Sequence, residues 1–139
     1  MNGLTRTAPD DTSAWGEVPV FMPSRIPDCA EEDPSLFYSE TEDMQKRLRM
    51  NVVRRICAGC PVLAECLLHG LTYEEWGAWG GLSERERAAL GGKARRSLRS
   101  FPPSLTAEEA IRPLQQAGAD PRSLDEALSA HRERDRGAA

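Results

Sequence analysis

Three of the four cysteines lie within ten residues of one another, and their spacing is the feature of this chain best suited to chemistry. Two residues separate Cys57 from Cys60, and five residues separate Cys60 from Cys66. Cys29 lies upstream beyond a 27-residue gap. Thiolates are soft ligands that select zinc, copper(I) or iron–sulfur clusters. The first thirty residues lack the apolar run of a secretory leader. We therefore expect reduced thiols used for metal or redox chemistry, not for disulfides.

Three kinds of thiol site are compatible with this spacing. Structural zinc usually takes two compact ligand pairs, and here Cys66 would have to pair with either Cys29 or His69. A [4Fe–4S] cube needs four thiolates but no second compact pair. A redox pair, Cys57 with Cys60, usually follows a strand, and we predict no strand here. The cluster is the favoured hypothesis; a zinc-stapled adaptor and a thiol–disulfide reductase are the alternatives.

The residues near the thiols in sequence favour a negatively charged group. Cys60 immediately precedes a predicted helix N-terminus, whose free N–H groups and dipole attract anions. Arg54 and Arg55 would add positive charge, and Phe37 and Tyr38 would contribute an apolar shell that limits access of water.

Helices are predicted on both sides of the cysteine segment. A capping box at Ser39 and Glu42 starts the first, which ends near 57–59. A stripe at steps of four predicts its buried face: Met44, Leu48, Val52 and Ile56. The second helix is predicted to begin at Pro61 and to end near Gly70.

A glycine-rich turn and three further helix starts complete the predicted elements. Residues 77–81 read Gly-Ala-Trp-Gly-Gly and predict a tight turn. Capping boxes predict helix starts at Ser83, Thr106 and Ser123. The helix after Ser83 should end at about residue 90, and Pro113 should shorten or kink the helix after Thr106.

Length and charge limit the class of protein. The 139 residues argue for one domain with tails, and no stretch approaches the roughly 20 apolar residues that span a bilayer. The net charge of −4 excludes a general nucleic-acid coat, so any DNA contact must be local. We expect a cytoplasmic, all-α protein: an irregular segment at 1–25, a cysteine domain at 26–99 and a helical tail at 100–139.

Taken together, the four cysteines and the tryptophan turn resemble the WhiB-like family of actinobacterial and actinophage transcription regulators. That family shows a lone cysteine, a long gap, C-x2-C-x5-C and then a turn of the form G-(V/I)-W-G-G. This chain has Ala78 where the family usually has valine or isoleucine, followed by a family-like Gly-Leu-Ser-Glu-Arg-Glu-Arg run at 81–87. The resemblance covers roughly residues 27–99, and the tail beyond Pro102 matches nothing in it.

The resemblance implies a non-enzymatic regulator whose cysteines hold a [4Fe–4S] cluster: Cys29, Cys57, Cys60 and Cys66. It further implies contact with the C-terminal domain of the primary sigma factor through the turn at Gly77, Trp79, Gly80 and Gly81. Phe37 and Tyr38 match an aromatic pair beside the cluster. Promoter DNA would be contacted by Lys93, Arg95 and Arg96, and some members respond to nitric oxide or oxygen.

Overall fold

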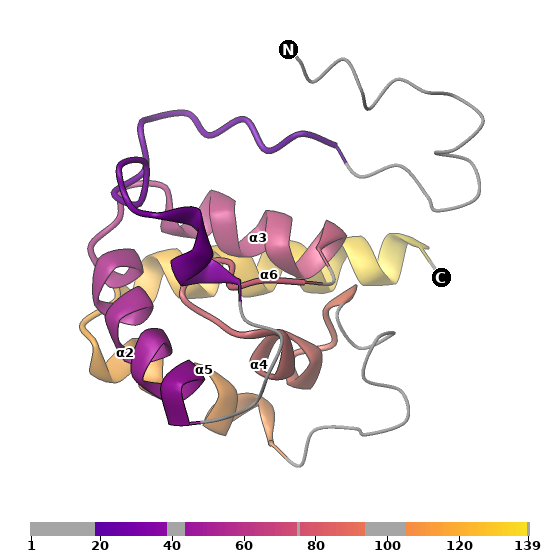
Figure 1. The fold of residues 1–139 in the computed structure, drawn as a ribbon. Helices are drawn as coiled ribbons and strands as arrows, with labels where there is room; N and C mark the ends of the chain where they lie inside the picture. Colours follow the sequence, from indigo (N-terminus) through magenta and orange to yellow (C-terminus); the bar gives the residue numbers. More distant parts are fainter. Residues whose placement is uncertain (1–18, 39–43, 75, 94–104, 139) are drawn as a thin grey trace, which may run out of the picture.

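The computed structural model describes residues 19–38, 44–74, 76–93 and 105–138 of the chain, and these residues are mostly helical (Figure 1). No β-strand occurs within the described ranges, which confirms the helical fold class. Within these ranges, the structure contains one 3-10 helix followed by α-helices: η2 (Pro34–Phe37), α2 (Met44–Ala58), α3 (Leu63–Tyr73), α4 (Glu84–Ala89), α5 (Ala107–Gln116) and α6 (Pro121–Ala138).

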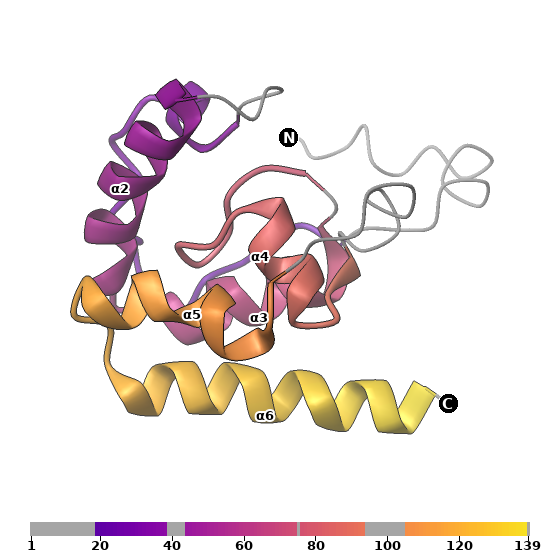
Figure 2. The ribbon, with the colours of Figure 1, turned by 90° about the horizontal axis from the view of Figure 1, so that it is seen from below.

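One apolar core joins the cysteine segment to the C-terminal helices. In Figures 1 and 2, α6 runs alongside α3, and α5 packs against α2 and α4. Residues from each part are fully buried in a single cluster: Val53, Leu67, Leu71, Leu82 and Leu114. The two helices predicted beyond Pro102 therefore exist and share the core of the residues before them.

Two of the predicted capping boxes are confirmed. The Ser83 hydroxyl accepts from the Glu86 N–H at 3.3 Å, while the Glu86 carboxylate accepts from the Ser83 N–H at 2.9 Å. Thr106 and Glu109 exchange the same pair of bonds at the start of α5. The predicted box at Ser39 and Glu42 lies outside the described residues.

The predicted buried stripe of α2 is wrong. Leu48 and Val52 are 57% and 37% exposed, whereas the buried positions are Met50, Val53 and Cys57. A spacing of three and then four follows the 3.6-residue helical turn, while repeated steps of four drift around the helix axis. The face carrying Cys57 points into the molecule, Leu48 and Val52 face outward, and Ile56 is half-buried at the edge between the two faces.

Helix α3 begins later and ends later than predicted. Pro61 and Val62 form a turn before Leu63, and the helix continues through Gly70 to Tyr73. Gly70 is buried in the helix interior. Glycine is required at this position because a Cβ would collide with the side chain of Trp79. This glycine allows a close approach between elements and does not end the helix.

The C-terminal helices also differ in detail from their predicted bounds. Helix α5 runs through Pro113 and ends one turn later, at Gln116. Helix α6 starts at Pro121, not near Ser123, and the Asp120 carboxylate accepts from the Arg122 N–H at 3.0 Å. Proline suits the first helical position, because its missing N–H would have no helical partner there.

Candidate metal centre

All four cysteines line one cavity of about 280 Å³. Cys29 comes from the loop before η2, Cys57 from the last turn of α2, Cys60 from the connection to α3 and Cys66 from α3 itself. The rest of the lining is largely apolar and includes Phe21, Phe37, Ile56, Val62, Leu63 and Trp79. The fold thus brings thiols from two distant parts of the sequence to a single space.

Backbone N–H groups donate to two of the sulfurs. The Gly80 N–H lies 3.2 Å from Cys66 Sγ, and the Asp28 N–H lies 3.4 Å from Cys60 Sγ. Hydrogen bonds of this kind stabilise the thiolate form and tune the potential of sulfur-ligated metals.

The surroundings of three of the thiols, Cys29, Cys57 and Cys66, favour their protonated form when no cation is bound. Burial raises the pKa of Cys66 to about 12, although the Gly80 N–H acts in the opposite direction. Burial, followed by the nearby thiols, raises the pKa of Cys57 well above its ordinary value and also raises that of Cys29. A metal ligand must be a thiolate, so a bound group has to bring compensating positive charge.

The cavity is larger than a single ion requires. Zinc–sulfur bonds of about 2.3 Å would draw four sulfurs to about 3.8 Å from one another, leaving no void between them. In the part of the chain that the structure describes, no group of three or more His, Cys, Asp or Glu side chains is arranged to hold a metal ion. All four cysteines border this space of about 280 Å³, which would admit a group larger than one ion.

The predicted tight turn forms part of this cavity wall. Trp79 and Leu82 exchange two backbone hydrogen bonds at 3.0 and 3.1 Å. The two residues between them, Gly80 and Gly81, have φ of +61° and +81°, values that favour glycine at both central positions of the turn. A Cβ on Gly80 would meet the Leu67 Cα at 2.6 Å, so the turn lies directly against α3.

Arg87 is hydrogen-bonded to residues on both sides of the turn. Its side chain is fully buried and donates to the carbonyls of Gly77 at 2.5 Å and Leu82 at 3.0 Å. Burial lowers its pKa to about 10, while Glu84 and Glu74 act in the opposite direction, so the group stays charged at neutral pH. Sequence analysis missed this role, because the Ser-Glu-Arg-Glu-Arg run was interpreted only as a helix start and a family motif.

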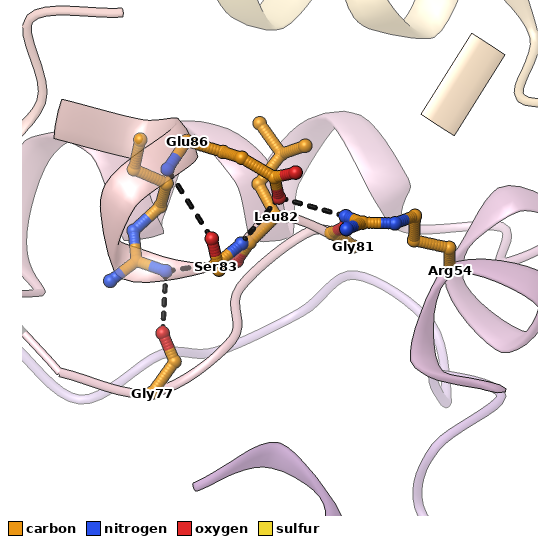
Figure 3. A network of polar contacts seen from close by, with 7 residues as sticks. Arg54, Gly77, Gly81, Leu82, Ser83 and Glu86 are labelled. Atoms are coloured by element: carbon orange, nitrogen blue, oxygen red, sulfur yellow. Dashed lines mark hydrogen bonds and ion pairs between the residues drawn. The ribbon is translucent and has the colours of Figure 1, made fainter. Parts of the chain in front are cut away.

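Arg54 ties α2 to the same turn, as Figure 3 shows. Its Nη1 donates to the Gly81 carbonyl at 3.2 Å and forms an ion pair with Glu86 at 2.8 Å. The expected contribution of Arg54 to a positive field at the thiols is therefore offset by a carboxylate. Its observed contacts hold together the helix that carries Cys57 and the turn that touches Cys66.

Trp79 is half-buried and lies among aromatic rings. Its ring centroid is 4.9 Å from that of His69 and 5.7 Å from that of Phe21, which approaches edge-on. Its indole N–H donates to the Trp76 carbonyl at 3.2 Å. Trp76, which sequence analysis did not single out, is 63% exposed and presents the larger aromatic surface to solvent.

Phe37 and Tyr38 both line the cavity, from the end of η2. The Phe37 carbonyl accepts from the Ala78 N–H at 2.7 Å, and the Tyr38 ring leaves no room for a Cβ on Gly77. The aromatic pair therefore also supports the tryptophan turn.

The predicted DNA-contacting residues lie at the edge of the described chain. Lys93 is half-buried just beyond α4, whereas Arg95 and Arg96 lie outside the described residues. None of the helices in the described segments is both long and apolar enough to cross a membrane.

Comparison with known proteins assigns the chain to a family. The model of the transcription factor WhiB family matches residues 24–90, which contain all four cysteines and the tryptophan turn. WhiD of Streptomyces coelicolor is 41% identical over 73 residues, covering 50% of this chain and 65% of that protein. WhiB1 of Bifidobacterium longum is 37% identical over 73 residues, covering 52% and 79%.

A third relative, WhiB2 of Mycobacterium tuberculosis, is 43% identical over 63 residues, covering 45% of this chain and 65% of its own length. No solved structure matches the chain. These findings confirm the resemblance, and the chain belongs to the WhiB family of transcriptional regulators. The family model ends at residue 90 and does not cover residues 105–138, and this chain spans about two thirds of the length of WhiD and of WhiB2.

Proposed function

We propose that this chain is an iron–sulfur transcriptional regulator that docks on the C-terminal domain of the primary sigma factor. Cys29, Cys57, Cys60 and Cys66 would ligate a [4Fe–4S] cluster, which supplies sensitivity to oxidants or nitric oxide. The observation that carries the proposal is the meeting of all four thiols at one cavity whose wall is the tryptophan turn.

The chain's own residues provide the environment that such a group needs. The apolar lining limits water, and the Gly80 and Asp28 N–H groups are placed to donate to sulfur. The turn that touches Cys66 also carries Trp79, so the state of the thiols is connected by short contacts to the proposed docking residue.

Anaerobic purification tests the metal assignment. Iron and acid-labile sulfide should each approach four per chain, with the visible absorption of a cubane cluster. A colourless protein that carries one zinc per chain would replace the cluster with the zinc-stapled adaptor. Cys29→Ser should abolish the chromophore, because Cys29 is the one cavity cysteine contributed by the N-terminal segment.

Substitution of tryptophan tests the docking role. Trp79→Ala should remove most recovery of sigma factor in an anaerobic pull-down, since large aromatic side chains dominate binding hot spots. Trp76→Ala is the matched control, three residues away and exposed. Equal loss in the two variants, or loss only in Trp76→Ala, would move the anchor away from Trp79.

Contact with promoter DNA would come from the basic segment that contains Lys93, Arg95 and Arg96. Replacing Arg95 and Arg96 with alanine should weaken DNA binding and reduce its salt dependence, because fewer phosphate counterions are released.

Location in the cytoplasm and the domain boundaries at residues 25/26 and 99/100 remain predictions.

A thiol–disulfide reductase would need an accessible, readily ionised thiol. Cys57 is only 8% exposed, and burial raises its pKa, which opposes the formation of the attacking thiolate. Insulin reduction by cluster-free protein measures this activity directly. We expect none above that of a Cys57→Ser control.

A further inference from the structure

The helices α5 and α6 lie beyond the family match, yet they complete the core around the thiols. The family model ends at residue 90, whereas α5 begins at Ala107 and α6 ends at Ala138. Ala110 and Leu114 of α5 and Leu124 and Ala127 of α6 are 3% exposed or less. Their spacings of four and three place each pair on one helical face.

Leu114 of α5 lies against the glycine turn that forms part of the cavity wall. A Cβ placed on Gly81 would meet Leu114 Cδ1 at 2.7 Å and Cys57 Cβ at 3.2 Å. Leu114, the glycine turn and Cys57 thus meet at one point, with no space for an added methyl group. Leu82, the next residue after Gly81 in the chain, is also fully buried.

The same turn is connected to a second thiol. The Gly80 N–H donates to Cys66 Sγ at 3.2 Å, and the Gly81 carbonyl accepts from Arg54 at 3.2 Å. If Leu114 did not fill the space behind Gly81, the turn would be free to move away from both Cys57 and Cys66. Helix α6 adds a contact at the far end of α3, where Arg134 donates to the Tyr73 hydroxyl at 3.1 Å.

We propose that α5 forms an intramolecular buttress of the thiol cavity, in which Leu114 positions Cys57 and the glycine turn, whereas α6 packs chiefly on α3. This buttress controls how readily the bound group is lost and how readily the bare thiols react. The inference rests on the proposed function only for the identity of the bound group; the contacts belong to the chain itself.

Cluster-free, full-length protein provides a test that does not depend on the metal. Alkylation by iodoacetamide would be followed at Cys57 and Cys29 in the same molecules by peptide mass spectrometry. Leu114→Ala should raise the rate at Cys57 several-fold more than the rate at Cys29. Because Cys29 is partly exposed in the folded chain and Cys57 is buried, global unfolding alone also raises this ratio, so a control variant of matched stability is needed.

Leu124→Ala is the matched control, because it removes an equally buried leucine from α6, on the other helix of the pair. It should lower the denaturation midpoint as Leu114→Ala does, and so report the rise in the Cys57-to-Cys29 ratio that global unfolding causes. The ratio in Leu114→Ala should be several-fold higher than in this control. A ratio that is the same in both variants would overturn the proposal. Should Leu114→Ala fail to fold, Leu114→Val provides the same comparison with a smaller expected increase.

Reconstituted protein provides the second measurement. Loss of cluster absorbance in the presence of an iron chelator should be several-fold faster in Leu114→Ala than in Leu124→Ala. If the chain takes up no cluster, the proposed function fails while the alkylation ratio still tests the buttress. If the cluster forms and is lost equally fast in both variants, the buttress fails while the proposed function stands.

Discussion

The two walls of the thiol cavity are built differently. On one side stand α2, α3 and the glycine turn, where Cys57, Val62 and Leu63 are at most 8% exposed. On the other side lies the segment 19–38, which contributes Phe21 and Cys29 and in which no residue is fully buried. The first wall is part of the core, and the second wall packs on the surface of that core.

The described residues of the outer wall are attached by hydrogen bonds, including the one from Asp28 to Cys60, and by the packing of η2 on α2. Ser24 donates to the Glu65 carboxylate with both its N–H and its hydroxyl, and the Phe37 carbonyl accepts from Ala78. Val20, Met22 and Ile26 are between 54% and 81% exposed, so Phe21 docks on the body while the apolar residues around it do not. Opening of the cavity should therefore begin at 19–38 and leave the helices in place.

The largest effect is expected from removing the buried charge of the inner wall. Arg87→Met removes a donor to the Gly77 carbonyl and one of the two donors to the Leu82 carbonyl, together with a buried charge. This should lower the free energy of unfolding by roughly 3–5 kcal/mol. Guanidinium unfolding followed by circular dichroism measures it. Arg85→Met, on the same helix but half-buried, should stay within about 0.5 kcal/mol of wild type.

An effect of intermediate size is expected at the turn. Gly80→Ala places a Cβ 2.6 Å from the Leu67 Cα in addition to the strain of a φ of +61°. Gly91→Ala isolates the strain, since Gly91 has a φ of +83° with nothing within 4 Å, and should cost about 1–2 kcal/mol. We expect Gly80→Ala to cost about 1–3 kcal/mol more. Equal losses in thermal or denaturant unfolding would show that the inner wall accommodates the added Cβ at Gly80 at no cost beyond the backbone strain.

The smallest change in global stability is expected at the attachment of the outer wall. Glu65→Gln removes one acceptor from Ser24 and should change the free energy of unfolding by less than about 1 kcal/mol. Amide hydrogen exchange of residues 19–27 should nevertheless become faster, while exchange in α3 stays unchanged. Glu31→Gln, an exposed substitution in the same outer segment, is the control.

The same attachment should depend on pH. Its hydrogen bonds from Ser24 lower the pKa of Glu65 below the ordinary value of 4.5. Because the folded pKa is the lower one, this stabilisation is complete above pH 4.5 and is lost as the pH falls through the lowered pKa. Exchange of 19–27, corrected for its intrinsic pH dependence, should rise in that window in wild type but not in Glu65→Gln.

Local signals in the sequence were sufficient for much of the inner wall. The cysteine spacing predicted a shared site, and the capping boxes at Ser83 and Thr106 form as expected, because each bond pattern is complete within four residues. At the start of α6, the Asp-Pro pair at 120–121 overlaps with the predicted capping box at Ser123. The helix begins at Pro121, so the Asp-Pro pair determines its start.

Features that depend on distant contacts were not predictable in this way. Gly70 resembles a helix end until Trp79 is seen against it. The buried face of α2 is set by α5 and η2, which no short window of sequence contains. The same holds for Leu114, whose neighbour Gly81 lies 33 positions earlier in the chain.

The position of Trp79 on the cavity lining has a spectroscopic consequence. An indole that borders the thiols would have its fluorescence quenched by any coloured group bound there, whereas Trp76 is not part of that lining. Emission from Trp79, isolated by replacing the other tryptophans with phenylalanine, would then serve as a label-free gauge of cavity occupancy in real time.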